Sequence, residues 1–361
     1  MGVITLNNSK TLHALTMDMI ECFQDILEAH KRDDTLRAIL INSNPTEKRA
    51  AFCAGGDVKA VVQQGLDPNG PDPASFFFEE YKVNHAVATS KIPIISLWDG
   101  VVMGGGAGIS IHGKYRVATE NTLFAMPETA IGLYPDVGSS WWMNQLLERP
   151  VANYLALTGA KIYAADLLYT GLATHYVPSS KLKDLEGELV EATEKKEGED
   201  VVASVLMSYH EAIDSSDCIL AANHATIKEA FDDIDVEGIM SNLQFNSSEF
   251  SAQSLQTLQR MSPTALKVTF EALSRGAACR SVGEALQMEC RISNRFSQPG
   301  SDFYEGVRAA LIDKDRSPKW NPSTLQEVTP DMVATYFEKL ENEWPIPEAD
   351  PASKSSTASK L

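Results

Sequence analysis

Short, mostly apolar runs alternate with amphipathic stretches from the start of the chain to about Leu147. The runs are apolar at consecutive positions, which predicts strands that are buried on both faces. The stretches between them repeat their apolar residues every three or four positions, which predicts helices. This alternation indicates an α/β fold. The expected strands are residues 3–6, 38–41, 92–98 and 123–125.

Helix start signals support the same prediction. Thr16 precedes a stretch with apolar residues at 17, 20, 23 and 27, and threonine is a favoured N-cap. A second helix is expected over residues 76–88, with a stripe that includes Phe77 and Tyr81. From Ala152 onward the pattern is mainly helical, and Ser262-Pro263 predicts a further helix start, because proline suits a first helical turn.

Glycines gather at two predicted junctions between a strand and a helix. The first reads C-A-G-G-D at 53–57, where Asp57 is expected to be a simple N-cap, and the second reads M-G-G-G-A-G at 103–108. A helix start leaves backbone N–H groups unpaired, and glycine lets a ligand approach them, so each junction favours a negative charge or a polarised carbonyl. The alternative is that the glycines serve close helix–strand packing. Neither G-x-G-x-x-G nor G-x-x-x-x-G-K-[ST] is present, so these nucleotide-phosphate cradles are not indicated.

Two carboxylates, Glu128 and Asp136, follow the second glycine junction. Apolar residues flank Glu128, which favours burial, and a buried acid is uncommon without a role. Gly132 and Pro135 interrupt any helix between the two acids, so a loop can bring both into one pocket. The alternatives are a first-turn surface acid for Glu128 and a helix N-cap for Asp136. Glu80 is either a functional acid or an exposed glutamate near a helix start.

Composition excludes some classes of partner and site. Thirty-one Lys and Arg residues against 49 Asp and Glu give a net charge of −18, which repels nucleic acid and anionic membranes. No apolar run reaches the roughly 20 residues that span a bilayer. Seven histidines without an H-E-x-x-H motif do not indicate a metal site. Five cysteines without C-x-x-C spacing favour reduced thiols and an intracellular compartment.

The two ends of the chain differ in targeting signals. The N-terminus shows no signal peptide or arginine-rich presequence and opens on the first predicted strand, so whether a segment precedes it stays open. The chain ends in Ser359-Lys360-Leu361, a peroxisomal address that an import receptor reads. The tripeptide sits on a stretch rich in Pro, Ser, Ala and Lys, which we expect to be disordered. We therefore predict a peroxisomal location, with that receptor as a partner.

The two glycine junctions, about 50 residues apart, resemble those of the crotonase (enoyl-CoA hydratase/isomerase) superfamily. Within it, F-A-M-P-E-T-A-I-G-L-Y-P-D-V-G and I-D-K-D-R-S-P-K-W resemble the branch that hydrolyses 3-hydroxyisobutyryl-CoA. The resemblance runs from about Val3 to Trp344. It implies a crotonase-like spiral of ββα units over residues 1–180, a mainly helical region over 181–344 that covers the site, and a disordered tail over 345–361 that carries the targeting signal.

The resemblance also implies roles for single residues. Two backbone N–H groups form the oxyanion hole of the family, and they correspond to Gly56 and Gly105. In the hydrolase branch, the residues that contact substrate or act in catalysis correspond to Glu80, Gly105, Glu128 and Asp136, and we expect Glu128 and Asp136 to be catalytic. The implied reaction is hydrolysis of the thioester of 3-hydroxyisobutyryl-CoA in valine breakdown. Unbranched 3-hydroxypropionyl-CoA is an alternative substrate, since the two differ by one methyl group. No cofactor or metal is implied, because coenzyme A is part of the substrate.

Several alternatives stay open. Glu128 is either a nucleophile that forms a mixed anhydride or a general base for water. A hydratase or isomerase of the same fold and a catalytically silent acyl-CoA-binding protein are alternatives to a hydrolase. Enoyl-CoA hydratases carry a second glutamate where this chain has Gly108, which argues against hydration. The oligomeric state is open between a homo-oligomer, as in many trimeric relatives, and a chain whose C-terminal helices cover that surface.

The chain departs from the pattern of the superfamily in two blocks. The early block carries Asn8, Ser9 and His13, and it lacks an arginine, which leaves Lys10 as the nearest cation for the phosphates of coenzyme A. After P-D-V-G the chain continues with Ser139-Ser140-Trp141, which we expect to reshape the acyl pocket.

Overall fold

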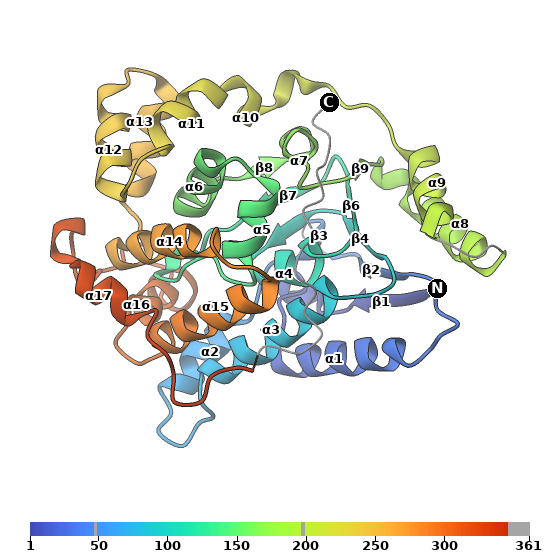
Figure 1. Cartoon of the computed structure of the whole chain (residues 1–361), viewed down its shortest axis with the longest axis horizontal. Coiled ribbons are helices and arrows are strands. Elements are labelled where there is room, and N and C mark those ends of the chain that lie inside the picture. The colour runs from blue at the N-terminus through green and yellow to red at the C-terminus, as the bar shows by residue number, and fades with distance from the viewer. Residues whose placement is uncertain (47–48, 196–198, 346–361) are drawn as a thin grey trace.

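The computed structural model describes residues 1–46, 49–195 and 199–345 (Figure 1). The strands among them are β1 (Gly2–Leu6), β2 (Ile39–Ser43), β3 (Ala51–Cys53), β4 (Ile94–Trp98), β5 (Val101–Met103), β6 (Tyr115–Ala118), β7 (Leu123–Ala125), β8 (Ile162–Tyr163) and β9 (His175–Tyr176). They form two sheets. One sheet has the order β1-β2-β4-β6-β9 and is parallel throughout. The other has the order β3-β5-β7-β8, in which β8 pairs antiparallel with β7.

From β2 to β7, successive strands alternate between the two sheets. β2 of the first sheet is followed by β3 of the second and then by helix α2 (Val58–Gly65). β4 is followed in the same way by β5 and α4 (Gly105–Ile111), and β6 by β7 and the 3₁₀ turn η2 (Glu128–Ile131). Each unit therefore adds one strand to each sheet and ends in a helical turn. The predicted α/β fold, a spiral of ββα units, is confirmed.

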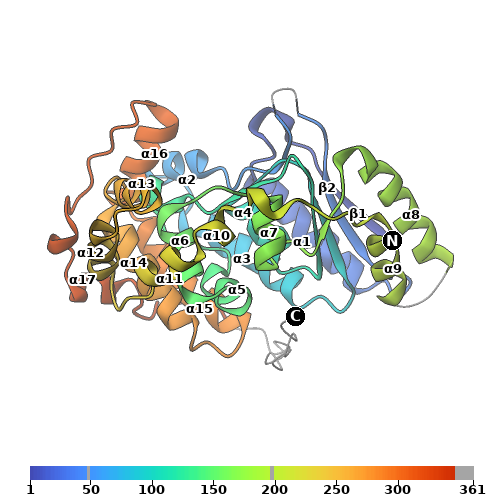
Figure 2. The same cartoon turned by 90° about the horizontal axis from the view of Figure 1, so that it is seen from above.

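Helices surround the two sheets (Figures 1 and 2). Helix α3 (Ala74–Ala88) packs against α1 (Met17–Lys31), α4 and α15 (Val282–Phe296), so it joins the early helices to the C-terminal ones. The other helices are α5 (Ser139–Leu146), α6 (Arg149–Thr158), α7 (Ala164–Thr170), α8 (Leu182–Lys195), α9 (Glu199–Tyr209), α10 (Ile219–Ala222), α11 (His224–Phe231), α12 (Val236–Phe245), α13 (Glu249–Leu258), α14 (Pro263–Gly276), α16 (Asp302–Val307) and α17 (Pro330–Thr335). No described helix combines the length and apolar character that crossing a bilayer requires.

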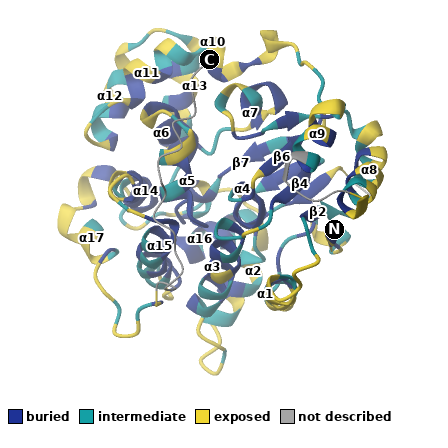
Figure 3. Cartoon of the chain, turned by 45° about the vertical axis from the view of Figure 1, so that its right-hand side comes forward, coloured by how far each residue is buried: buried dark blue, intermediate teal, exposed yellow. Residues whose placement is uncertain are grey.

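The most apolar elements lie at the centre of the molecule. β4 is buried at each of its five positions and α4 at each of its seven. Figure 3 shows these elements surrounded by helices whose outer faces are exposed. The glycine-rich helix α4 is therefore an inner element, which explains why it carries no polar outer face.

The predicted helix starts are confirmed in detail. The Thr16 hydroxyl accepts a hydrogen bond from the Met19 amide at 3.3 Å, and the Asp57 carboxylate accepts one from the Ala60 amide at 3.1 Å. Ser262 caps α14 in the same way. The strand β5 was not predicted as a separate element, because three residues between Gly100 and the glycine cluster are too few to show a period.

The proposed division of the chain at residue 180 stays a prediction. β9 is the last strand among the described residues, and the later described elements are helical. The tail predicted over 345–361 lies outside the described residues except for Pro345.

Arg116 on β6 is a buried cation that ties two helix ends to the sheet. Its guanidinium donates to the Leu172 carbonyl at 2.6 Å and to the Gly113 carbonyl at 2.5 Å, and further donors reach the carbonyls of Ile111 and Gly171. Burial lowers the pKa of Arg116 to about 10. The last carbonyls of a helix lack partners of their own, so Arg116 supplies donors where α4 and α7 end.

We predict that Arg116→Met lowers the free energy of unfolding by about 3 kcal/mol or more, because each buried carbonyl left without a donor costs about 1–3 kcal/mol. Urea unfolding followed by tryptophan fluorescence measures the change. The control is Arg280→Met, whose side chain is 84% exposed. It should change the stability by less than about 0.5 kcal/mol. An equal effect of both substitutions would contradict the prediction.

Candidate active site

The two glycine junctions meet at one point in the fold. Gly55 and Gly56 connect β3 to α2, Gly104 precedes α4, and β3 and β5 are neighbours in one sheet. Gly55 has a φ of 104° and Gly104 a φ of 46°, which side chains disfavour. A β-carbon at Gly55 would lie 3.9 Å from the Gly105 nitrogen, and one at Gly106 would lie 2.4 Å from the Cys53 carbonyl oxygen. The interpretation of close packing is therefore correct for Gly106, and the same packing brings Gly56 near Gly105.

The amides of Gly56 and Gly105 have no protein acceptor among the hydrogen bonds of the described residues. Leu15 pairs with the flanking residues instead, since its N–H donates to Gly55 and its carbonyl accepts from Asp57, both at 2.8 Å. Gly105 is the first residue of α4, and a first-turn N–H has no acceptor within its own helix. Both amides are thus available to a ligand, and their action as one oxyanion hole stays a prediction.

Glu128 lies beside the second junction. A β-carbon at Gly104 would lie 2.9 Å from Oε1 of Glu128. The residue is 6% exposed, and Oε2 has no hydrogen-bond partner among the described residues. Burial, and after it the charge of Asp136, raises the pKa of Glu128 well above its usual range. The alternative of a surface acid is therefore wrong.

Helix α16 holds the turn that carries Glu128. A β-carbon at Gly132 would lie 2.2 Å from the Asp302 carbonyl oxygen, and one at Gly306 would lie 2.2 Å from the Ile131 carbonyl oxygen. The backbones of η2 and α16 are therefore in direct contact, which larger residues at these two glycines would prevent. The position of Glu128 depends in this way on a helix that lies about 170 residues further along the chain.

Asp136 is buried and bonded to a cluster of hydroxyl groups. The Tyr81 hydroxyl donates to Oδ2 of Asp136 at 2.8 Å and lies 2.6 Å from the Ser293 hydroxyl. The Tyr134 hydroxyl lies 2.9 Å from that of Ser293. Burial raises the pKa of Asp136 to about 7, although the bond from Tyr81 opposes the shift. Helix α5 starts after Gly138 without a side-chain cap, so Asp136 is not its N-cap.

Glu80 faces the same place from α3. A β-carbon at Gly105 would lie 2.1 Å from Oε1 of Glu80, and this oxygen has no partner among the described residues. Burial, then the charges of Asp136 and Glu128, raises the pKa of Glu80 well above its usual range. Its neighbour Glu79 is partly exposed and pairs with Lys82 at 2.6 Å. The surface alternative therefore holds for Glu79 and is wrong for Glu80.

The sequence did not identify Tyr81 and Ser293 as parts of the site. They come from α3 and α15, and 212 residues separate them, so no local pattern relates the two side chains. Tyr81 was placed only on the apolar stripe of its helix. The one available signal was a polar residue, Asn84, on that same stripe.

Position 108 has no room for a side chain. A β-carbon there would lie 2.6 Å from Cβ of Val137 and 2.8 Å from Nδ2 of Asn84. Contacts below 3.0 Å require the neighbours to move, and Val137 and Asn84 are fully buried. A glutamate at this position, as hydratases carry, does not fit this site.

The blocks that depart from the superfamily pattern have structural roles. The His13 ring accepts a hydrogen bond from the Asn8 amide at 3.0 Å and lies 2.8 Å from the Asn44 carbonyl, so it donates through Nε2 and is neutral. The Ser139 and Ser140 hydroxyls bond to Pro135 and Glu289, so they are directed at the protein. The Cys53 thiol is buried and donates to the His13 carbonyl at 3.1 Å, and burial raises its pKa to about 12, which disfavours the thiolate.

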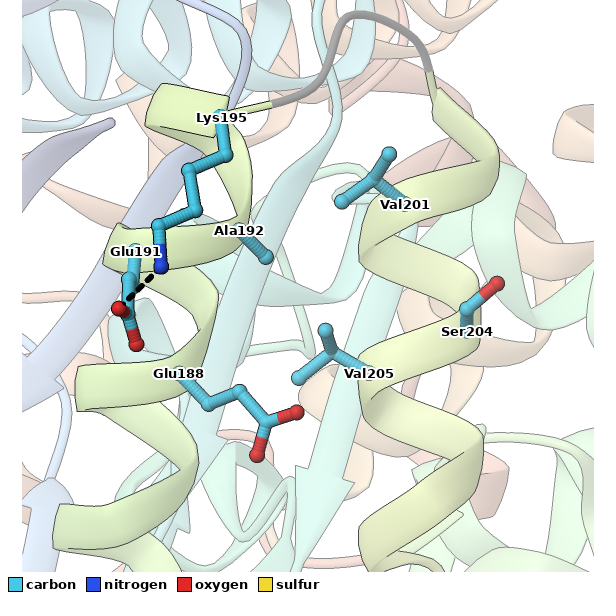
Figure 4. A pocket seen from close by; sticks show the side chains of 7 residues that line it. All are labelled: Glu188, Glu191, Ala192, Lys195, Val201, Ser204 and Val205. Carbon is cyan, nitrogen blue, oxygen red and sulfur yellow. Dashed lines mark hydrogen bonds and ion pairs between the residues drawn. The ribbon is translucent and has the colours of Figure 1, made fainter.

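A separate groove of about 490 Å³ lies between α8 and α9 (Figure 4). Its lining includes Glu188, Ala192 and Val205, and none of the carboxylates described above. Among the described residues, no three His, Cys, Asp or Glu side chains are grouped to hold a metal ion.

The fold and the site define a class of protein. The chain matches the model of the enoyl-CoA hydratase/isomerase family over residues 1–337, and it therefore belongs to that family, the crotonase superfamily. Within it, the chain belongs to the 3-hydroxyisobutyryl-CoA hydrolases. It is 45% identical to the mitochondrial 3-hydroxyisobutyryl-CoA hydrolase of Xenopus tropicalis and 42% identical to that of Homo sapiens. These alignments cover 94% of this chain and 87% and 86% of the relatives.

Solved structures with the same fold carry other names. A carnitinyl-CoA dehydratase from Mycobacterium thermoresistibile superposes with a TM-score of 0.86 and is 32% identical in sequence. The match covers 96% of each chain. An enoyl-CoA hydratase from Rhodobacter sphaeroides has a TM-score of 0.82 and 32% identity over 94% of both chains. The fold alone therefore does not select one reaction.

The predicted peroxisomal location is wrong. The sequence relatives from Xenopus tropicalis, Xenopus laevis and Homo sapiens are all named as mitochondrial proteins. Ser359-Lys360-Leu361 lies outside the described residues and is three residues long, whereas the likeness extends over 94% of the chain. A targeting tripeptide is recognised by its receptor independently of the fold. The predicted partnership with the import receptor therefore fails together with the predicted location.

The buried acids should make the stability depend on pH. The pKa of Asp136 is about 7 in the folded chain, above the value of about 3.9 for an exposed aspartate, so the native state binds more protons than the unfolded state between these values. We predict that the free energy of unfolding falls from about pH 4.5 to about pH 7.5, and falls less in Asp136→Asn. Urea unfolding at both pH values measures the slope. The control Glu79→Gln should keep the slope of the unmodified protein, and an unchanged slope in Asp136→Asn would refute the prediction.

Proposed function

We propose that this protein hydrolyses the thioester of short 3-hydroxyacyl-CoA substrates, with 3-hydroxyisobutyryl-CoA as the main substrate, in valine breakdown. The observation that carries the proposal is a buried Glu128 beside Gly104, at the junctions where the amides of Gly56 and Gly105 have no protein acceptor among the described residues. The high identity to hydrolases along most of the chain supports the choice of reaction. An acyl-CoA substrate is common to the names of the relatives and of the solved structures.

In the proposed mechanism the thioester oxygen lies between the N–H groups of Gly56 and Gly105. These donors stabilise the negative charge that forms on this oxygen when the carbonyl carbon is attacked. Glu128 either attacks that carbon itself or removes a proton from an attacking water molecule. In both routes the carbon–sulfur bond breaks, and the sulfur leaves as the coenzyme A thiolate and takes up a proton. When water is the attacking group, this step releases the 3-hydroxy acid. When Glu128 attacks, it leaves a mixed anhydride, which water then hydrolyses to the acid and the free Glu128 carboxylate.

Glu80 and Asp136 act on the substrate beside Glu128 in this proposal. Three buried carboxyl groups next to one another cannot all carry a charge, so some of them retain protons at neutral pH. A protonated carboxyl donates a hydrogen bond, which suits the 3-hydroxyl of the acyl group or the attacking water. The Tyr81 hydroxyl stabilises the charged form of Asp136 specifically. The residues proposed to contact substrate are therefore Glu80, Gly105, Glu128 and Asp136.

Hydration of an enoyl-CoA is the second candidate, because two solved structures of the same fold carry the names of a dehydratase and a hydratase. The close contacts at Gly108 argue against it, since they leave no place for a second glutamate. Free thiol distinguishes the two reactions, since hydrolysis releases it and hydration does not. Binding of acyl-CoA without any turnover would point instead to a catalytically silent binding protein.

We predict that Glu128→Gln lowers thiol release by at least about 10²-fold, because a general base or nucleophile is lost. Binding of the CoA ester should remain, since the glycine amides are backbone groups. Thiol release is measured against a panel of branched and unbranched short acyl-CoA esters, and ester binding by calorimetry. The control is Glu120→Gln, at an exposed acid that bonds to Ser179. Near-normal turnover of Glu128→Gln would remove Glu128 from the mechanism.

Turnover by the unmodified protein in heavy-oxygen water tests the anhydride route, because only that route can place the label in Glu128. In the anhydride route, water that attacks the Glu128 carbon leaves its oxygen in the enzyme. In the general-base route, the label goes to the acid product alone. Mass analysis of the peptide with Glu128 after many turnovers reads the difference.

A further inference from the structure

The segment that carries Asp136, residues 135–140, has a strained backbone. Val137 has a φ of 55°, in the left-handed region that a β-branched residue strongly disfavours. Gly138 follows with a φ of 78°. Such a conformation persists only where the surroundings hold it in place, and it is often found beside functional groups. We call residues 135–140 the Asp136 turn.

Glu289 on α15 holds this turn through three hydrogen bonds. Oε2 accepts from the Gly138 amide at 2.6 Å, and Oε1 accepts from the Ser140 amide at 3.0 Å and from the Ser140 hydroxyl at 2.6 Å. Its backbone carbonyl also accepts from the Tyr134 hydroxyl at 2.9 Å, on the other side of Asp136. One residue of the C-terminal region thus contacts both flanks of Asp136.

Other groups also contact the turn: the Tyr81 hydroxyl donates to Asp136 at 2.8 Å, and the Asn144 amide donates to the Ser140 carbonyl at 2.8 Å. The His112 ring lies 3.0 Å from the Val137 carbonyl and donates to it, and the Val137 side chain rests on Gly108. The titratable groups that interact electrostatically with Glu289 are Asp136, Tyr81, Tyr134, Cys279 and Cys290. Glu289 is fully buried, yet both of its oxygens are bonded, whereas Glu80 and Glu128 each keep an oxygen without a partner. The oxygens of Glu289 are therefore used to bind the protein backbone, whereas Glu80 and Glu128 each have an oxygen that is free to bind a ligand.

We propose that Glu289 is a positioning residue, whose carboxylate fixes the left-handed Val137–Gly138 backbone and thereby directs Asp136 toward the site. The expected effect of Glu289 on kcat rests on the proposed thioester hydrolysis. Its expected effect on the backbone of the Asp136 turn does not. Burial raises the pKa of Glu289 to about 8, and the hydrogen bonds from Ser140 and Gly138 oppose this rise because they stabilise the charged carboxylate. A glutamine at this position presents an NH₂ group to at least one of these donors, and that bond is lost.

The test compares Glu289→Gln with Asp166→Asn. Asp166 is a matched control, because it is fully buried, accepts from the Leu220 amide at 2.8 Å, and lies on α7 away from the Asp136 turn. In Glu289→Gln, kcat for thiol release should fall about 10- to 100-fold with little change in KM, because a small misplacement of a reacting group has an effect of about this size. Amide hydrogen exchange of the peptide that covers residues 134–142 should become faster. Asp166→Asn should change neither quantity in the folded fraction.

The outcomes are distinct. Unchanged kcat and unchanged exchange in Glu289→Gln would overturn the proposal, and so would an equal loss of kcat in Asp166→Asn. If the unmodified protein releases no thiol, the proposed function fails, and exchange of the 134–142 peptide still decides whether Glu289 holds the turn. If Glu289→Gln does not fold, Ser140→Ala removes one of the three bonds and should give the same changes in smaller size. Their absence in Ser140→Ala would overturn the proposal.

Discussion

The direct contact between two backbones, residues 53–56 against residues 104–106, is the constraint on which the rest of the structure depends. A β-carbon at Gly106 would lie 2.4 Å from the Cys53 carbonyl oxygen, so the two strand-to-helix junctions approach too closely for a side chain at this position. This approach requires two adjacent strands of one sheet, each followed at once by a helix, and the ββα spiral provides them. It leaves two amide N–H groups at the junctions without protein acceptors.

The three acids of the site are buried, and packed helices and turns hold them in position without ion pairs among the described residues. Glu80 comes from α3, Glu128 from the turn that rests on α16, and Asp136 from the turn that Glu289 of α15 holds. Burial raises the pKa of all three, and the nearby negative charges raise the pKa of Glu80 and Glu128 further. Burying several carboxyl groups that are unfavourable in their charged form lowers the free energy of unfolding. Active sites with catalytic carboxylates commonly combine shifted pKa values with such a loss of stability. Two C-terminal helices, α15 and α16, therefore hold the turns that carry two of the three acids.

The sequence predicted the parts of this arrangement that depend on local pattern. Apolar runs identified strands, caps identified helix starts, and the glycine clusters identified both junctions. Motifs that match the hydrolase branch identified Glu80, Glu128 and Asp136, and the structure brings these acids together. Contacts between distant segments could not be predicted, since no periodicity links Tyr81 with Ser293 or Gly138 with Glu289. The terminal tripeptide misled the prediction of location, because a short address carries no packing information by which the fold could check it.

The central claim is that two glycine amides bind the thioester oxygen while Glu128 faces the carbonyl carbon. A crystal structure of the Glu128→Gln variant with intact 3-hydroxyisobutyryl-CoA tests it most directly. The account predicts that the thioester oxygen lies within about 3 Å of both the Gly56 and Gly105 nitrogens, the usual length of such a hydrogen bond. A thioester oxygen that contacts neither amide, or an acyl group bound away from residue 128, would contradict it.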